Sequence, residues 1–130
     1  MTTSINQPWA ISEKYSSRYG QTWTNMDFVF EQKISAENFK TDPMNCTMGT
    51  LSVAGQSISM RYKDLITYTK AIETYTNNMY ASKPKKDDAF SLEIKGRTML
   101  LVKHEIGKLN ETLNDALNIA MRKYELGLYL

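Results

Sequence analysis

The side chains that most often carry out chemistry are scarce in this sequence. It contains one histidine, His104, and one cysteine, Cys46. A His/Cys zinc site needs several such ligands, and a catalytic Ser or Cys needs a neighbouring base, so these two residues support neither kind of site. Asp87 and Asp88 are paired carboxylates, but they lie in a charged stretch with no apolar pocket to raise the pKa of either. We therefore expect no catalytic residue, no metal and no cofactor.

Basic and aromatic side chains offer a different chemistry, which is contact with nucleic acid. Lys and Arg bind phosphates, and an exposed aromatic ring stacks on an unpaired base. The net charge of +2 is too small to indicate such a ligand by itself. Four cations nevertheless fall near the predicted outer strand faces and helix starts, and one tryptophan has an outward position in a predicted strand. These five residues form the predicted nucleic-acid-binding surface: Arg61, Lys95, Arg97, Lys103 and Trp23.

Length and composition indicate one globular domain. The chain has 130 residues, of which 42% are hydrophobic and 23% charged, as in ordinary proteins with a packed core, and we treat 1–130 as a single domain. No apolar run reaches the roughly 18 residues that span a bilayer, and the first residues lack the pattern of a secretory signal. A lone cysteine agrees with a reducing compartment. We expect a soluble cytoplasmic protein without a membrane partner.

The N-terminal part of the chain divides into an arm, a strand and a loop. Residues 1–20 are rich in Thr, Ser, Asn, Gln and Tyr without periodicity, so we expect an irregular arm. Within 22–31, Met26, Phe28 and Phe30 occupy alternate positions, which is the period of a strand with one buried face. A loop that contains Asp42-Pro43 should follow this strand.

Two similar units make up most of the remaining chain. Each is predicted to form two strands joined by a short turn and followed by a helix, over 49–80 and over 89–125. A shift of 41 residues places Gly55 on Gly96 and superposes the apolar positions. In the strands these are Leu51, Val53, Ile58 and Met60 on Leu92, Ile94, Met99 and Leu101; in the helices, Leu65, Tyr68, Ile72, Tyr75 and Met79 on Ile106, Leu109, Leu113, Ala116 and Ala120.

The repeat predicts the fold. Since the apolar positions have the same parity in all four strands, each hairpin should bury one face, and each helix should bury one stripe. Agreement at so many positions favours an internal duplication over coincidence. We predict an α+β fold of duplicated ββα units, with an antiparallel sheet backed by two amphipathic helices, plus the N-terminal strand and the arm.

Some apolar residues fall where a wet surface is expected. Leu100 and Val102 have outward positions in the last predicted strand, and Leu128 and Leu130 belong to an apolar C-terminal tail. Apolar residues at such positions need a cover, which either the arm or a second subunit could supply. We predict that these four residues form an oligomer interface and that the protein is a homo-oligomer.

A family resemblance adds to this interpretation. The stretch 58–65, followed by Tyr68 and Ile72, resembles the last strand and helix start of the positive-cofactor coactivators, which are related in fold to the Whirly proteins. The stretch 99–106, followed by Leu109 and Leu113, repeats the likeness. The resemblance implies binding of single-stranded nucleic acid on antiparallel sheets backed by helices. Those families have four strands per helix where two are predicted here, and their sheets carry more basic and aromatic residues.

Two functions follow as hypotheses. The first is a non-catalytic protein that binds single-stranded DNA or RNA through a sheet face, which the duplicated sheet and the resemblance favour. The alternative is a protein-protein interaction module, such as an inhibitor, adaptor or assembly component, that acts through an exposed apolar face. The near-neutral charge agrees better with this alternative. We take nucleic-acid binding as the leading hypothesis because the repeated sheet provides a physical site.

Overall fold

The structure, a computed structural model, describes residues 26–31 and 36–126. The predicted arm, Trp23, Leu128 and Leu130 lie outside the described residues. The elements along the chain are β1 (Asp27–Phe30), α2 (Ala36–Thr41), the 3-10 turn η2 (Pro43–Asn45), β2 (Thr47–Val53), β3 (Gln56–Arg61), α3 (Tyr62–Ala81), β4 (Ala89–Ile94), β5 (Arg97–Val102) and α4 (Lys103–Leu126).

Two ββα units are present, as the repeat predicts. The strands β3 and β5 begin 41 residues apart, at Gln56 and Arg97, and α3 and α4 begin 41 residues apart, at Tyr62 and Lys103. The predicted loop after β1 is wrong in part, because it contains α2 and η2. These elements are too short to show a helical period in the sequence. The first unit also begins two residues early, at Thr47 instead of Gly49.

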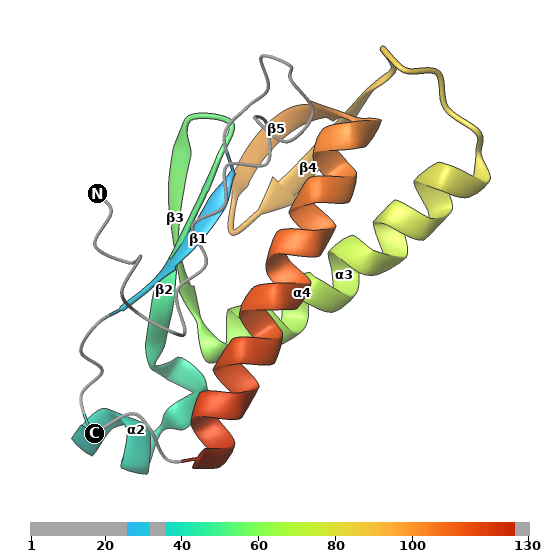
Figure 1. The fold of residues 1–130 in the computed structure, drawn as a ribbon. Helices are drawn as coiled ribbons and strands as arrows, with labels where there is room; N and C mark the ends of the chain where they lie inside the picture. The colour runs from blue at the N-terminus through green and yellow to red at the C-terminus, as the bar shows by residue number, and fades with distance from the viewer. Residues whose placement is uncertain (1–25, 32–35, 127–130) are drawn as a thin grey trace.

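The strands form two separate antiparallel sheets, one of three strands in the order β1-β2-β3 and one of two strands, β4-β5. Figure 1 shows β1, β2 and β3 together at the left and the β4–β5 hairpin at the top, with α4 running beside both sheets. Two-residue turns close the hairpins, at Ala54-Gly55 and at Lys95-Gly96, and all four residues have a positive φ of 50° to 80°. This is the type I′ turn that matches strand twist, and its second position suits glycine.

The core lies between the inner sheet faces and the helices. Every superposed strand position is buried, and Leu65 and Ile106, which match in the two helices, are both fully buried. The helices cross in contact with one another (Figure 1), and the Thr69 hydroxyl of α3 donates to the Leu113 carbonyl of α4 over 3.3 Å. The duplication therefore extends to which face of each element is buried.

Gly49 allows the close approach of β1 to β2. In the antiparallel register of these strands, Gly49 of β2 lies opposite Phe30 of β1, next to the pair Thr50 and Val29. A Cβ atom at Gly49 would collide with the carbonyl oxygen of Val29 and with the ring of Phe28. Because Gly49 has no side chain, β1 can pair with β2 and extend the β2–β3 hairpin to three strands.

Among the helices of the described ranges, none is long and apolar enough to cross a membrane.

Candidate functional site

Three charged side chains meet where β3 runs into α3. Asp64 accepts hydrogen bonds from Arg61 through Nε at 3.0 Å and Nη2 at 3.0 Å, and from Lys95 Nζ at 2.9 Å. Asp64 is 4% exposed, whereas the side chains of Arg61 and Lys95 are 37% and 30% exposed. The three residues, which we call the Asp64 cluster, bring together two of the four predicted phosphate-binding cations.

The position of Asp64 follows from helix capping. The backbone N–H of Arg61, just before α3, donates to the Asp64 carboxylate over 2.8 Å. In the second unit the N–H of Val102 donates in the same way to Glu105 over 3.0 Å, again 41 residues later. A carboxylate at the third helical position satisfies an N–H that the helix leaves open. The cap is thus part of the repeat, and the first unit adds two cations to it.

The cluster holds Asp64 in its ionised form. Burial by itself would raise the pKa of this carboxyl group. Hydrogen bonds from the Arg61 side chain and backbone, and from Lys95, outweigh burial, so that the pKa lies well below its usual range. The hydrogen bond to Asp64 raises the pKa of Arg61 in turn. Asp64 and Arg61 therefore both stay charged at neutral pH.

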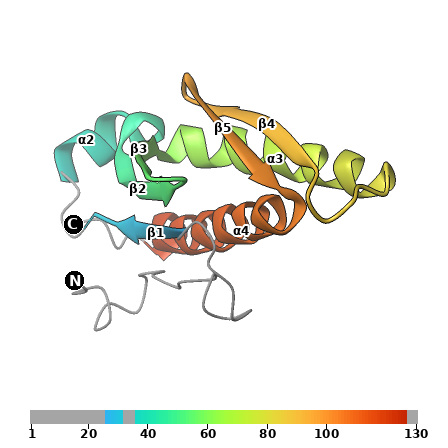
Figure 2. The same ribbon diagram turned by 90° about the horizontal axis from the view of Figure 1, so that it is seen from above.

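Lys95 also ties the two units together. Its ammonium donates to the carbonyl of Ser59 in β3 over 2.9 Å, and its backbone N–H donates to the Tyr68 hydroxyl of α3 over 3.1 Å. Figure 2 shows the tip of the β4–β5 hairpin lying over the start of α3. Lys95 belongs to the turn itself, with a φ of 50° that is unusual for a residue other than glycine. Its contacts hold the second hairpin against the first unit.

These contacts use much of the donor capacity that phosphate binding would need. A guanidinium has five N–H groups and an ammonium three. Arg61 makes three side-chain hydrogen bonds, two to Asp64 and one to Asn45 at 2.8 Å, and Lys95 makes two. Few donors remain free to point outward. That both residues contact phosphates stays a prediction. In the structure their side chains bond to Asp64, Asn45 and Ser59 of the same chain.

The other predicted cations lie apart from one another. Arg97 is exposed at the start of β5, two residues after Lys95. Lys103 follows the end of β5, and its Nζ lies 3.5 Å from the carbonyl of Pro84 in the linker between the units. A six-residue strand is about 20 Å long, so Arg97 and Lys103 cannot bind the same phosphate. Arg97 is therefore near Lys95 along the chain, whereas Lys103 lies at the other end of β5.

The outer face of the β4–β5 hairpin carries an apolar patch. Leu100 is 70% exposed and lies opposite Ser91, and the half-buried Val102 lies opposite the exposed Ala89. Since Leu100 and Val102 are two residues apart on one strand, their side chains share this face. The sequence prediction that Leu100 stands exposed on the outer face is confirmed. We call Ala89, Leu100 and Val102 the outer patch.

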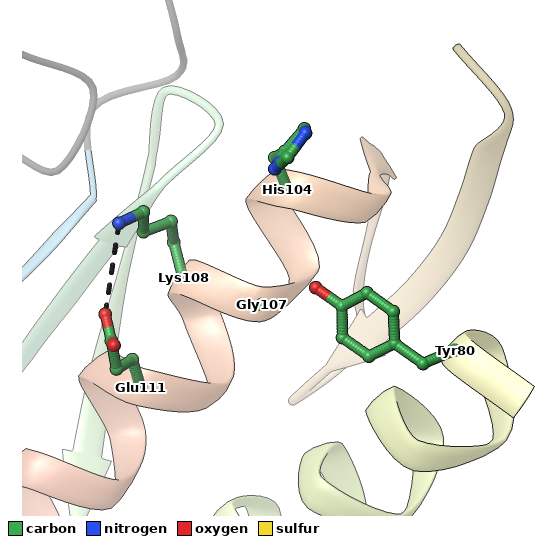
Figure 3. Close-up of a pocket in the computed structure, with 5 residues that line it drawn as sticks. All are labelled: Tyr80, His104, Gly107, Lys108 and Glu111. Carbon is green, nitrogen blue, oxygen red and sulfur yellow. Dashed lines mark ion pairs between the residues drawn. The ribbon is translucent and has the colours of Figure 1, made fainter. Parts of the chain in front are cut away.

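A pocket of about 180 Å³ lies against α4, lined by Tyr80, His104, Gly107, Lys108 and Glu111. In Figure 3 the Tyr80 hydroxyl points at the helix near Gly107, whereas Lys108 and Glu111 point to another side of it, with Lys108 Nζ 4.0 Å from Glu111 Oε1. His104 points away from both. These side chains do not converge on one point where a substrate could react. Across the described ranges, no three His, Cys, Asp or Glu residues are grouped to hold a metal.

The sequence did not indicate two features of this pocket. Lys108 is only 6% exposed, although lysine is almost always a surface residue. Gly107 leaves room for Tyr80, since a Cβ there would lie 2.8 Å from the Tyr80 hydroxyl. The residues next to Gly107 and Lys108 in the sequence do not indicate either feature. Both depend on how α3 and α4 cross, because Tyr80 of α3 reaches α4 only in the folded chain.

Comparisons with known proteins give no family for this chain: no family model matches it, and neither does any curated protein or solved structure. The resemblance to the coactivator and Whirly families therefore stays a prediction from the residues alone.

Proposed function

We propose that this protein is a non-catalytic interaction module, an adaptor or assembly component, that binds a protein partner through the outer face of the β4–β5 hairpin. The observation that supports the proposal is the exposure of Leu100, at 70%, beside Val102 and Ala89. A single exposed leucine is common on proteins, but adjoining apolar side chains on a sheet face are a feature of binding surfaces.

The duplication supplies an internal comparison for this face. Shifting by 41 residues places Leu100 on Ser59 and Val102 on Arg61. Ser59 is exposed in β3, and the residue opposite it on β2 is Thr50, which is polar as well. The fold therefore accepts a polar residue at this position. Leucine in the second unit is a departure that folding does not require, which favours a role in binding.

A photo-crosslinking experiment tests this function. With p-benzoylphenylalanine in place of Leu100 in the full chain, we expect light-dependent adducts, because the ring lies on the proposed contact face. The same group in place of Ser59 is the matched control, since that position is equivalent in the other unit and should give few adducts. Mass spectrometry identifies what is attached. Equal adduct yields at the two positions, in both purified protein and cell extract, would contradict the proposal.

Single-stranded nucleic acid is a second candidate ligand, and the Asp64 cluster is the observation in its favour. The cluster has two cations and one carboxylate, and the exposed Arg97 follows Lys95 by two residues in the same hairpin. Charged donors that are already held in place lose little side-chain entropy on contact with a phosphate. The polar outer face of β2 and β3, with Thr50, Ser57 and Ser59, could contribute further hydrogen bonds.

Salt dependence tests this second candidate. We expect a labelled single-stranded oligonucleotide to bind the wild-type protein with an affinity that falls as salt rises. Replacing Arg97 by Gln should reduce the logarithmic slope by about 0.7 to 1 for one lost phosphate contact. Arg97 suits this test because Arg61 and Lys95 also stabilise the fold. Lys86→Gln, in the exposed linker, is the charge-matched control. Absence of any salt-sensitive binding would exclude nucleic acid as the ligand.

Both proposals include a cytoplasmic location. Cys46 is buried and free, as is usual for cysteine in a reducing compartment. Burial, together with the charge of Asp42, raises the pKa of its thiol. A thiol of this kind is a poor nucleophile at neutral pH, which agrees with a protein whose role is binding.

A further inference from the structure

We propose that the partner on this face is a second copy of the same chain, which pairs its β5 with β5 in antiparallel orientation and joins two hairpins into a four-stranded sheet. This inference rests on the proposed interaction function and names its partner. The argument begins with the backbone groups that point away from each hairpin.

The register determines which backbone groups face outward. In a two-residue hairpin the residues that flank the turn, here Ile94 and Arg97, exchange hydrogen bonds, and the next pair along does not. Glu93, Ser91, Thr98 and Leu100 therefore direct their N–H and C=O groups away from the partner strand. The Tyr75 hydroxyl confirms this parity, because it donates to the outward carbonyl of Ser91 over 2.9 Å.

On the edges of β3 and β4, and at the end of β5, one outward group is already bonded to another part of the chain. The carbonyl of Ser59 on β3 accepts from Lys95, the carbonyl of Ser91 on β4 accepts from Tyr75, and the N–H of Val102 donates to Glu105. Within the described ranges, no residue bonds the outward N–H and C=O of Thr98 and Leu100. The edge of β5 is thus open at two successive outward positions, where a further strand can add.

A second copy fits this edge better than an unrelated strand because the open groups are self-complementary. When two copies run antiparallel with Thr98 of each opposite Leu100 of the other, all four open groups of each copy are used, in four hydrogen bonds between the chains. The two-fold axis then passes between the two Met99 residues. The arrangement closes on itself and leaves no further open position at the centre of either β5.

The side chains along this edge also suit a second copy. Thr98, Met99 and Leu100 are uncharged, and β5 lacks the lysine, proline or bulge that commonly protects an exposed edge strand. On the outer face each Leu100 would lie beside Thr98 of the other copy. Arg97 would lie opposite Leu101 of the other copy. If the partner strand were shifted by two residues, Arg97 would lie opposite Lys103 instead. Repulsion between these two cations therefore favours the register that pairs Thr98 with Leu100.

The size of the complex, measured by sedimentation over a concentration series of the full chain, tests the proposal. We expect a reversible dimer. Leu100→Ser should raise its dissociation constant by about tenfold or more, because it removes apolar contact area on both copies. Serine occupies the equivalent position in the first unit, so this variant should fold.

Thr98→Pro removes an outward N–H that makes no bond to β4, and it should abolish the dimer. Ser57→Pro, at the equivalent edge position of β3, is the matched control and should leave dimerisation unchanged.

The outcomes separate this inference from the proposed function. A wild-type monomer whose position-100 crosslinks reach other proteins, or residues of its own N-terminal segment, would overturn the second copy as the partner. In the first of these cases the interaction function would remain. A dimer that survives both Leu100→Ser and Thr98→Pro would show that the copies meet elsewhere and would overturn the pairing of β5. Loss of the dimer in Thr98→Pro, with the circular dichroism melt unchanged and Ser57→Pro still dimeric, would support it.

Discussion

Replacing Leu113 by Ala should lower the free energy of unfolding by about 2–5 kcal/mol. Leu113 is fully buried in the middle of α4, and its carbonyl accepts the hydroxyl of Thr69 from α3. Truncation leaves a cavity between the helices, which the crossing elements cannot fully close. Ile72→Ala, at the equivalent position in α3, should have an effect in the same range. Denaturant unfolding and thermal melts measure both changes.

Leu100→Ala is the control for this prediction, because it makes the same chemical change at a leucine that is 70% exposed. Its effect on the monomer should stay within about 0.5 kcal/mol, the usual range for a surface substitution. The measurement belongs at low protein concentration, where association does not add to apparent stability. Equal destabilisation by the two substitutions would mean that the helices do not bury the stripe that the structure assigns to them.

Replacing Asp64 by Asn should lower the free energy of unfolding by about 1–3 kcal/mol at neutral pH. The substitution keeps the shape of the side chain but removes the charge that Arg61 and Lys95 share. Loss of one member of a buried ion pair can cost more, but both partners here are about one-third exposed and water can solvate them. Because Lys95 comes from the second unit, the substitution should also loosen the contact of the β4–β5 hairpin with α3.

The same variant should change how stability depends on pH. The pKa of Asp64 is lower in the folded protein than the value of about 3.9 expected in the unfolded chain. The unfolded chain therefore binds this proton first as the pH falls. The stabilisation from Asp64 is complete above about pH 5 and is lost progressively below it. Asp64→Asn should flatten the stability curve in this acid range.

Asp87→Asn is the matched control for the acid measurement, since Asp87 is an exposed carboxylate in the linker between the units. Its curve should follow that of the wild type. Urea unfolding at a series of pH values from 7 down to 3 compares the three proteins. If Asp64→Asn loses stability in acid as steeply as the wild type, the Asp64 cluster is not the source of the pH dependence.

Local patterns in the sequence were sufficient to predict much of the fold. Alternation at Leu51 and Val53, and three- and four-residue steps from Leu65 to Met79, indicate elements whose period is a property of the backbone itself. The matched glycines, Gly55 and Gly96, mark turns that need a positive φ. Because each of these signals involves neighbouring residues, it can be read without knowledge of the rest of the chain.

The tertiary structure decided which distant residues meet. Nothing in the sequence places the ammonium of Lys95 on Asp64, 31 residues earlier, or directs Lys108 into a buried position. Capping by Asp64 is local, but its second cation arrives only because the β4–β5 hairpin folds over α3. The division of the strands into two sheets, and hence the open edge of β5 at Thr98 and Leu100, follows in the same way. Such contacts depend on crossing angles and registers that many residues set together, and no single stretch of sequence encodes them.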